Sequence, residues 1–119
     1  MILRAFFGFL PLVLTAYPAL AGDPGRGQEV FKACAACHGD KPGDLGPSLI
    51  GVVGRAAGSR DDFRYSGPME RAGFIWDEAK LVAFVRDPRA VVPGTRMPFD
   101  GLADARDADD VVAWLASRK

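Results

Sequence analysis

The sequence predicts an all-α domain in which three to five short helices are joined by long loops. Apolar residues recur at spacings of three and four in separate segments, which is the periodicity of amphipathic helices. Between these segments, many of the 14 glycines and 9 prolines interrupt regular structure. No segment sustains the alternation of apolar and polar residues that indicates a half-buried strand. A length of 119 residues allows one domain.

Residues 1–21 are expected to be a cleaved secretory signal peptide, which leaves 22–119 as the domain and places it in the periplasm. The positive charge of Arg4 precedes an apolar stretch, and Ala19-Leu20-Ala21 offers a small-residue cleavage site. The alternative is a retained membrane anchor. The apolar run, however, contains Pro11 and is shorter than the ~20 residues that cross a bilayer.

The first helix is expected to begin at Asp23-Pro24, because aspartate is a favoured N-cap and proline suits the first helical position. Gly27, Phe31 and Cys34 then follow at helical spacings of four and three. From Gly39 to Gly67, glycine and proline are too dense for a long helix. Because structureless connections of this length are uncommon in compact domains, we expect this loop to wrap a bound group.

A short helical segment is expected near Met69, and a clearer helix follows Trp76. Asp77 can cap that helix, Asp87-Pro88 stops it, and its apolar face comprises Leu81, Phe84 and Val85. A second irregular stretch is expected from Arg89 to Gly101. The last helix is expected to start near Asp104, with an apolar stripe of Ala108, Val111, Val112 and Leu115 and with Trp114 alongside.

Composition excludes several classes of function. Equal numbers of basic and acidic residues, 15 each, argue against a nucleic-acid-binding module. Once Arg4 is removed with the signal peptide, the balance becomes 14 against 15. Two cysteines cannot build a disulfide-dense scaffold, and a single histidine excludes sites that need two imidazoles.

Both cysteines and the only histidine fall within the five residues Cys34-Ala35-Ala36-Cys37-His38. The order C-x-x-C-H is typical of c-type haem attachment. Two thiols three residues apart on a helical turn can form thioethers with the two vinyl groups of a porphyrin, while the next residue directs its imidazole at the iron. The motif predicts one haem c, covalently bound through Cys34 and Cys37, with His38 as an iron ligand.

Two other chemistries could use these residues. A thioredoxin-like redox pair expects a preceding strand in a βαβ setting, whereas the segment upstream of Cys34 has a helical pattern. A structural zinc site needs a fourth ligand, and beyond Cys34, Cys37 and His38 only a carboxylate could supply it.

A second iron ligand follows partly by elimination, because no other histidine exists. Met1 leaves with the signal peptide, and Met69 is interpreted as core filling. Met97 lies in a loop framed by Pro93 and Pro98, which restrict the backbone on either side, so we expect Met97 to be the second iron ligand. His/Met ligation raises the potential of a haem and suits an electron carrier.

On these residues the chain resembles class I c-type cytochromes of the mitochondrial-like bacterial type, over nearly all of residues 22–119. The resemblance includes three further motifs, which are Gly46-Pro47-x-Leu49-x-Gly51, Phe63-x-Tyr65-Ser66 and Pro93-Gly94-Thr95-Arg96-Met97. It implies the cytochrome c fold around one haem, and a soluble periplasmic one-electron carrier rather than an enzyme.

The resemblance also implies roles for individual residues. The Pro47 carbonyl would accept a hydrogen bond from the ring of His38, and Gly27 and Phe31 would pack against Trp114. The haem propionates would be contacted by Arg55, Tyr65, Trp76 and Thr95.

Some positions depart from the family pattern. Phe84 stands where many relatives have a tyrosine, and Met69 replaces a frequent asparagine, so the pocket should be drier and the potential higher. The usual lysine-rich rim is thin, and Arg89 and Arg96 carry much of the charge near the loop of Met97.

The implied partners are redox proteins: a membrane oxidase, a reductase, a photosynthetic centre or a periplasmic dehydrogenase. We expect a monomer that binds no nucleic acid and is not stably inserted in a membrane. Two alternatives remain at this stage. A haem enzyme or gas-binding sensor would need an open ligand position, and a thiol–disulfide oxidoreductase would show two titratable thiols and no haem absorbance.

Overall fold

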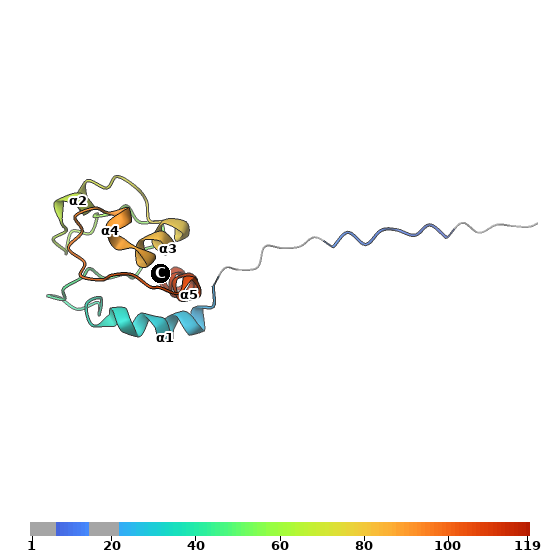
Figure 1. Ribbon diagram of the computed structural model, residues 1–119, viewed down its shortest axis with the longest axis horizontal. Helices are drawn as coiled ribbons and strands as arrows, with labels where there is room; N and C mark the ends of the chain where they lie inside the picture. The colour runs from blue at the N-terminus through green and yellow to red at the C-terminus, as the bar shows by residue number, and fades with distance from the viewer. Residues whose placement is uncertain (1–6, 15–21) are drawn as a thin grey trace, which may run out of the picture.

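The computed structural model describes residues 7–14 and 22–119, and within them it contains five helices and no strand (Figure 1). The helices are α1 (Pro24–Ala35), α2 (Gly67–Glu70), α3 (Glu78–Arg86), α4 (Pro88–Val91) and α5 (Ala105–Ser117). The only strand-like pairing in this part of the chain is a single antiparallel bridge between Ala56 and Ile75. The predicted all-α class, with short helices and long loops, is confirmed.

Much of the predicted signal peptide, including its cleavage site at 19–21, lies outside the described residues, and residues 7–14 form neither helix nor strand. Across the described ranges, no helix combines the length and apolar character needed to cross a membrane.

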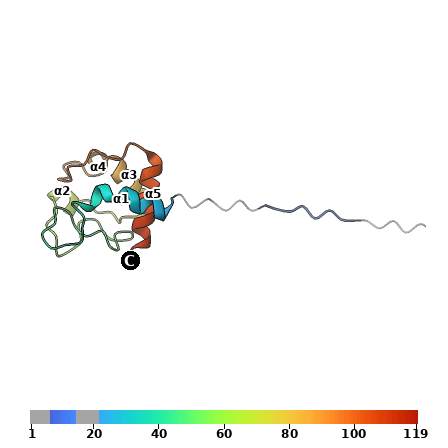
Figure 2. The same ribbon diagram turned by 90° about the horizontal axis from the view of Figure 1, so that it is seen from below.

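The first and last helices cross each other, as Figure 2 shows, and this crossing supports the segment that carries both cysteines. Phe31 of α1 packs on Trp114 of α5, with ring centroids 4.4 Å apart. A Cβ at Gly27 would collide with the carbonyl oxygen of Asp110, so only glycine lets the two backbones approach this closely.

The N-terminus of α1 is fixed by Asp23, whose carboxylate accepts hydrogen bonds from the backbone N–H groups of Gly25 and Arg26. The backbone N–H of Asp23 in turn donates to Oδ1 of Asp110 at 2.8 Å, and Arg26 donates to Oδ2 of the same residue at 2.6 Å. Asp110 is buried, with 3% of its surface exposed. Its contacts explain how a carboxylate is tolerated in the core, because both oxygens have donors.

α3 begins at its predicted cap, since Asp77 accepts from the backbone N–H of Lys80 at 2.7 Å. Leu81 and Phe84 are buried on the face that the sequence predicts. The prediction of an irregular stretch from Arg89 is wrong at its start, because the short helix α4 begins at Pro88 and extends to Val91. Asp87 is the C-cap of α3, where its backbone N–H donates to Ala83 O, and its carboxylate caps α4 by accepting from the N–H of Ala90.

A single apolar core joins α1, α3 and α5 to the loop segments. Its buried members include Val52, Trp76, Leu81, Phe84, Val111, Val112 and Leu115. Trp76 is held by edge-to-face contacts with Phe74 and Phe84, whose ring centroids lie 4.8 and 4.9 Å away. Cys34, Leu49, Met69 and Met97 are among the partly buried residues that pack against this core.

Candidate functional site

The C-x-x-C-H segment forms the turn in which α1 ends. The backbone N–H groups of Cys37 and His38 both donate to the carbonyl of Cys34, at 3.1 and 2.9 Å. This turn keeps the two thiols and the imidazole together at one end of α1. Both thiols are half-buried and neither forms a disulfide.

The imidazole of His38 is nearly buried and its orientation is fixed on one side. Its Nδ1 lies 2.8 Å from the carbonyl oxygen of Pro47. Because a carbonyl only accepts hydrogen bonds, Nδ1 carries the proton and Nε2 keeps its lone pair. A ligand nitrogen of this tautomer, with its second nitrogen bonded to a carbonyl, is the arrangement that metal-binding histidines adopt.

Gly46 provides the surface on which the ring of His38 lies. A Cβ at position 46 would stand 2.5 Å from Cε1 and 2.6 Å from Nδ1 of that ring. The backbone N–H of Gly46 also donates to the carbonyl of Cys37 at 2.9 Å, which brings the loop back beneath the motif. The absence of a side chain at position 46 therefore makes room for the imidazole.

The Cys34 thiol is poorly suited to act as the nucleophile of thiol–disulfide exchange. Burial raises the pKa of the Cys34 thiol, and the neighbouring Cys37 raises it further. Reactive cysteines instead have lowered pKa values in electropositive surroundings. Within the described ranges, no three side chains of His, Cys, Asp or Glu converge as a group that could hold a metal ion.

Met97 lies in a loop whose backbone is held by local hydrogen bonds. The N–H of Thr95 donates to Val92 O at 3.0 Å, and the N–H of Phe99 donates to Met97 O at 2.9 Å. The N–H of Met97 donates to the hydroxyl of Thr95 at 3.3 Å. Met97 belongs to the same apolar cluster as Cys34. Met69, in α2, also packs against this cluster, so burial alone does not distinguish the two methionines.

The residues predicted to contact propionates are brought together in part. The N–H of Trp76 donates to the carbonyl of Arg55 at 2.8 Å. The guanidinium of Arg55 donates to Ser48 O at 3.0 Å and Ile50 O at 3.2 Å, and burial lowers its pKa although the nearby Tyr65 acts in the opposite direction. Thr95 bonds instead within its own loop.

The residues present fit a covalently attached haem. Two unpaired thiols lie on one turn with an oriented imidazole that follows them directly. Leu49, Met69 and Met97 pack against the same core as Cys34 and are only partly buried, so each has apolar surface that a bound haem could cover.

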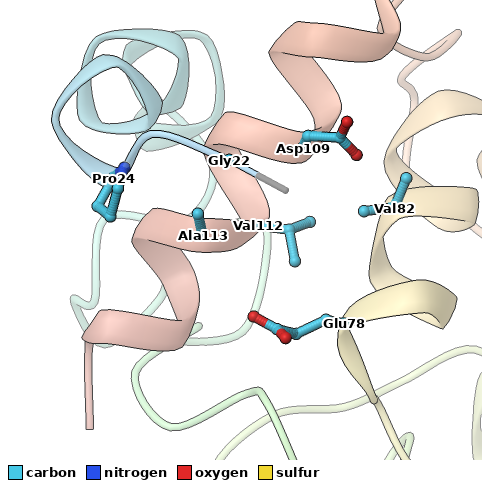
Figure 3. Close-up of a pocket in the computed structure, with 7 residues that line it drawn as sticks. All are labelled: Gly22, Pro24, Glu78, Val82, Asp109, Val112 and Ala113. Atoms are coloured by element: carbon cyan, nitrogen blue, oxygen red, sulfur yellow. The ribbon is translucent and has the colours of Figure 1, made fainter. Parts of the chain in front are cut away.

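A separate pocket of about 240 Å³ lies where the start of α1 meets α3 and α5 (Figure 3). It is lined by Gly22, Pro24, Glu78, Val82, Asp109, Val112 and Ala113. None of these residues is a cysteine, histidine or methionine, so this pocket contributes nothing to the candidate site.

Sequence reasoning missed three residues that hold the loop after His38. Ser48 donates to Asp40 at 2.7 Å, and Arg118 donates to the same carboxylate at 3.0 Å. Arg118 and Asp40 are 78 positions apart, and no local pattern relates them. The one available signal was that Asp40 closely follows the motif in a short loop.

Comparison with known proteins identifies the family. The sequence matches the cytochrome c family over residues 25–119. It is 48% identical to cytochrome c2 of Rhodomicrobium vannielii over 90% of this chain and 88% of that protein. It is 45% identical to cytochrome c2 of Rhodoblastus acidophilus over 83% of this chain and 95% of that protein.

The structure is similar to that of cytochrome cH from Methylobacterium extorquens. The TM-score is 0.77 at 39% sequence identity, over 81% of this chain and 99% of that one. The predicted cytochrome c fold is confirmed. The chain therefore belongs to the cytochrome c family of electron-transfer proteins, which carry covalently bound haem c.

Proposed function

We propose that this protein is a periplasmic one-electron carrier whose haem iron is ligated by His38 and Met97. The observation that carries the assignment is the 2.8 Å contact between Nδ1 of His38 and Pro47 O. This contact engages Nδ1 and leaves Nε2 free to bind iron. His38 directly follows Cys37 in the chain, so its imidazole lies next to the two thiols that can hold the porphyrin.

Each residue of the site has a distinct task. Cys34 and Cys37 would hold the porphyrin at the end of α1, and His38, which Gly46 and Pro47 support, would bind the iron. Met97 would supply a weak thioether ligand from a loop that its own hydrogen bonds hold in shape. Bound haem supplies one-electron chemistry at its iron, and no substrate bond is made or broken.

Arg55, Tyr65 and Trp76 are proposed to form the propionate side of the site. The backbone bond between Trp76 and Arg55 and the nearness of Tyr65 to the guanidinium support this grouping. A partly buried guanidinium beside a phenol and an indole can neutralise and hydrogen-bond a carboxylate. The hydroxyl of Thr95 accepts a hydrogen bond from the backbone N–H of Met97 and can donate its own proton to a propionate carboxylate.

Export to the periplasm is supported by the pattern of residues 1–21, with cleavage expected after Ala21. The partners are proposed to be redox proteins that dock briefly through a small interface. Near the loop of Met97, Arg89 is paired with Asp100 at 3.1 Å, and Arg96 donates to the backbone carbonyl of Arg64. Docking should therefore depend on salt less strongly than for a carrier with a lysine-rich face.

Substitution of the two candidate methionines tests the ligand assignment. Met97→Leu conserves volume but removes the thioether, so the six-coordinate spectrum should be lost, the potential should fall, and the reduced protein should bind carbon monoxide. Met69→Leu is the matched control and should keep the spectrum of the unmodified protein. Absorption spectra of oxidised and reduced holoproteins provide the measurement. A normal spectrum and potential in Met97→Leu would contradict the assignment.

A further inference from the structure

A hydrogen bond between Ser48 and Asp40 closes the loop that follows His38. Asp40 lies two residues after His38, and Ser48 directly follows Pro47, whose carbonyl meets Nδ1. The hydroxyl of Ser48 donates to Oδ1 of Asp40 at 2.7 Å. This hydrogen bond ties the chain beside the histidine to the chain beside its acceptor.

Arg118, at the end of α5, holds the same loop from outside. Its Nη2 donates to Oδ2 of Asp40 at 3.0 Å, and its carbonyl accepts from the N–H of Gly51 at 2.9 Å. The guanidinium stacks over the ring of Trp114, 4.7 Å from its centroid, which restrains it further. Arg118, Asp40 and Ser48 are called the loop clamp below.

The loop is held by polar contacts rather than by packed side chains on its outer side. A pocket of about 520 Å³ borders it, and Asp40, Gly46, Pro47 and Ser48 are among the lining residues. Asp40 also has a φ of 63°, in the left-handed region that non-glycine residues seldom adopt. The loop clamp therefore acts beside the Asp44 carboxylate, which accepts from the N–H groups of Gly39 and Lys41, and it is the part of this polar network that reaches both Asp40 and Ser48.

We propose that Arg118 is a positioning residue for the iron ligand, because through Asp40 and Ser48 it holds the Pro47 carbonyl against Nδ1 of His38. This inference rests on the proposed ligation of iron by His38. A firmly held acceptor makes the imidazole a stronger electron donor, which favours oxidised iron. Loss of the clamp should therefore raise the reduction potential.

Two substitutions separate positioning from simple electrostatics. Arg118→Gln removes a positive charge, and Asp40→Asn removes a negative one while keeping an oxygen acceptor and tolerating positive φ. If the two groups acted only as charges, Arg118→Gln would lower the potential and Asp40→Asn would raise it. Positioning predicts that both raise it, with a several-fold higher ratio of reduced to oxidised protein at a fixed applied potential.

The measurement is a spectroscopic redox titration of the holoproteins. Arg106→Gln is the control, because Arg106 is on the same helix but is largely exposed and pairs with Asp110 instead. It should leave the potential near that of the unmodified protein. Arg118→Lys should restore part of the original potential, and the double variant Arg118→Gln/Asp40→Asn should shift by less than the sum of the single shifts.

Hydrogen exchange gives an independent readout of the same loop. The N–H of Gly46, bonded to Cys37 O, should exchange faster in Arg118→Gln and at the normal rate in Arg106→Gln. Opposite potential shifts in Arg118→Gln and Asp40→Asn, or no shift in either, would overturn the positioning role. A spectrum of the unmodified protein that lacks His/Met ligation would instead overturn the proposed function.

Discussion

At the scale of single residues, the candidate site depends on the lack of a side chain at Gly46. The ring of His38 occupies the space that any Cβ there would need, and its hydrogen bond to Pro47 depends on that fit. Glycine is required here by a close approach of two groups. The same residue type occurs for other reasons elsewhere, as in the positive φ of 85° at Gly94.

Gly46→Ala should disturb the imidazole. The added methyl must displace the ring of His38 or the loop, and overpacking of this kind costs about 1–3 kcal/mol. We expect a lower denaturant midpoint, measured by urea unfolding of the holoprotein, and a changed reduction potential. Gly25→Ala is the control, because its Cβ would make only an ordinary contact with Asp23 at 3.4 Å in the first turn of α1. Equal midpoints and potentials in the two variants would contradict this interpretation.

At the scale of elements, the crossing of α1 and α5 is held by Asp110. The N–H of Asp23 and then the guanidinium of Arg26 lower the pKa of this carboxyl below its ordinary value. Such a group stabilises the fold above its unfolded pKa of about 3.9, and the stabilisation is lost as the pH falls through the lower folded value. The contacts of Asp110 therefore contribute stability to the crossing at neutral pH, and this contribution is lost in acid.

Asp110→Asn should remove that dependence. The variant should have a lower free energy of unfolding at pH 7, because a neutral amide binds Arg26 less strongly and donates as well as accepts. Between pH 5 and 2, its stability should fall less steeply than that of the unmodified protein. Urea unfolding at several pH values provides the measurement. Asp109→Asn, at the adjacent position of α5, should lower the stability little and keep the steep acid dependence.

The helices could be predicted from the sequence largely because their signals are local. Asp23, Asp77 and Asp104 each cap the helix that directly follows them. α4 was missed because Asp87-Pro88 can stop one helix and start another, and only the structure shows that it does both. The contacts of Arg118 with Asp40 join distant segments, so they depend on the tertiary fold and leave no local pattern.

At the scale of the whole molecule, the domain is small, and several apolar side chains around its core are only partly buried. A domain of this size buries little more than 60% of its unfolded surface. The thiol of Cys34 and the side chains of Leu49, Met69 and Met97 are only partly covered by other residues. The haem-binding motif was predictable because its residues are neighbours in the sequence, whereas the partial burial of these side chains depends on the tertiary fold.

The apoprotein should consequently be largely unfolded. Cys34→Ala/Cys37→Ala, which prevents covalent attachment, should lose most of the helical circular dichroism in the absence of haem. The matched control is the unmodified holoprotein, which should melt cooperatively. A haem-free double variant with a cooperative thermal transition would show that the polypeptide completes its own core.

The central claim is that the protein carries one His/Met-ligated haem c. Its most direct test is a redox titration of the unmodified holoprotein, monitored by its absorption spectrum. His/Met-ligated haem c predicts a single one-electron transition at a positive potential, haem absorbance that survives denaturation, and no rapid binding of carbon monoxide when reduced. A two-electron transition without haem absorbance would contradict the claim and identify thiol–disulfide chemistry. Rapid binding of carbon monoxide would show an open ligand position and contradict ligation by Met97.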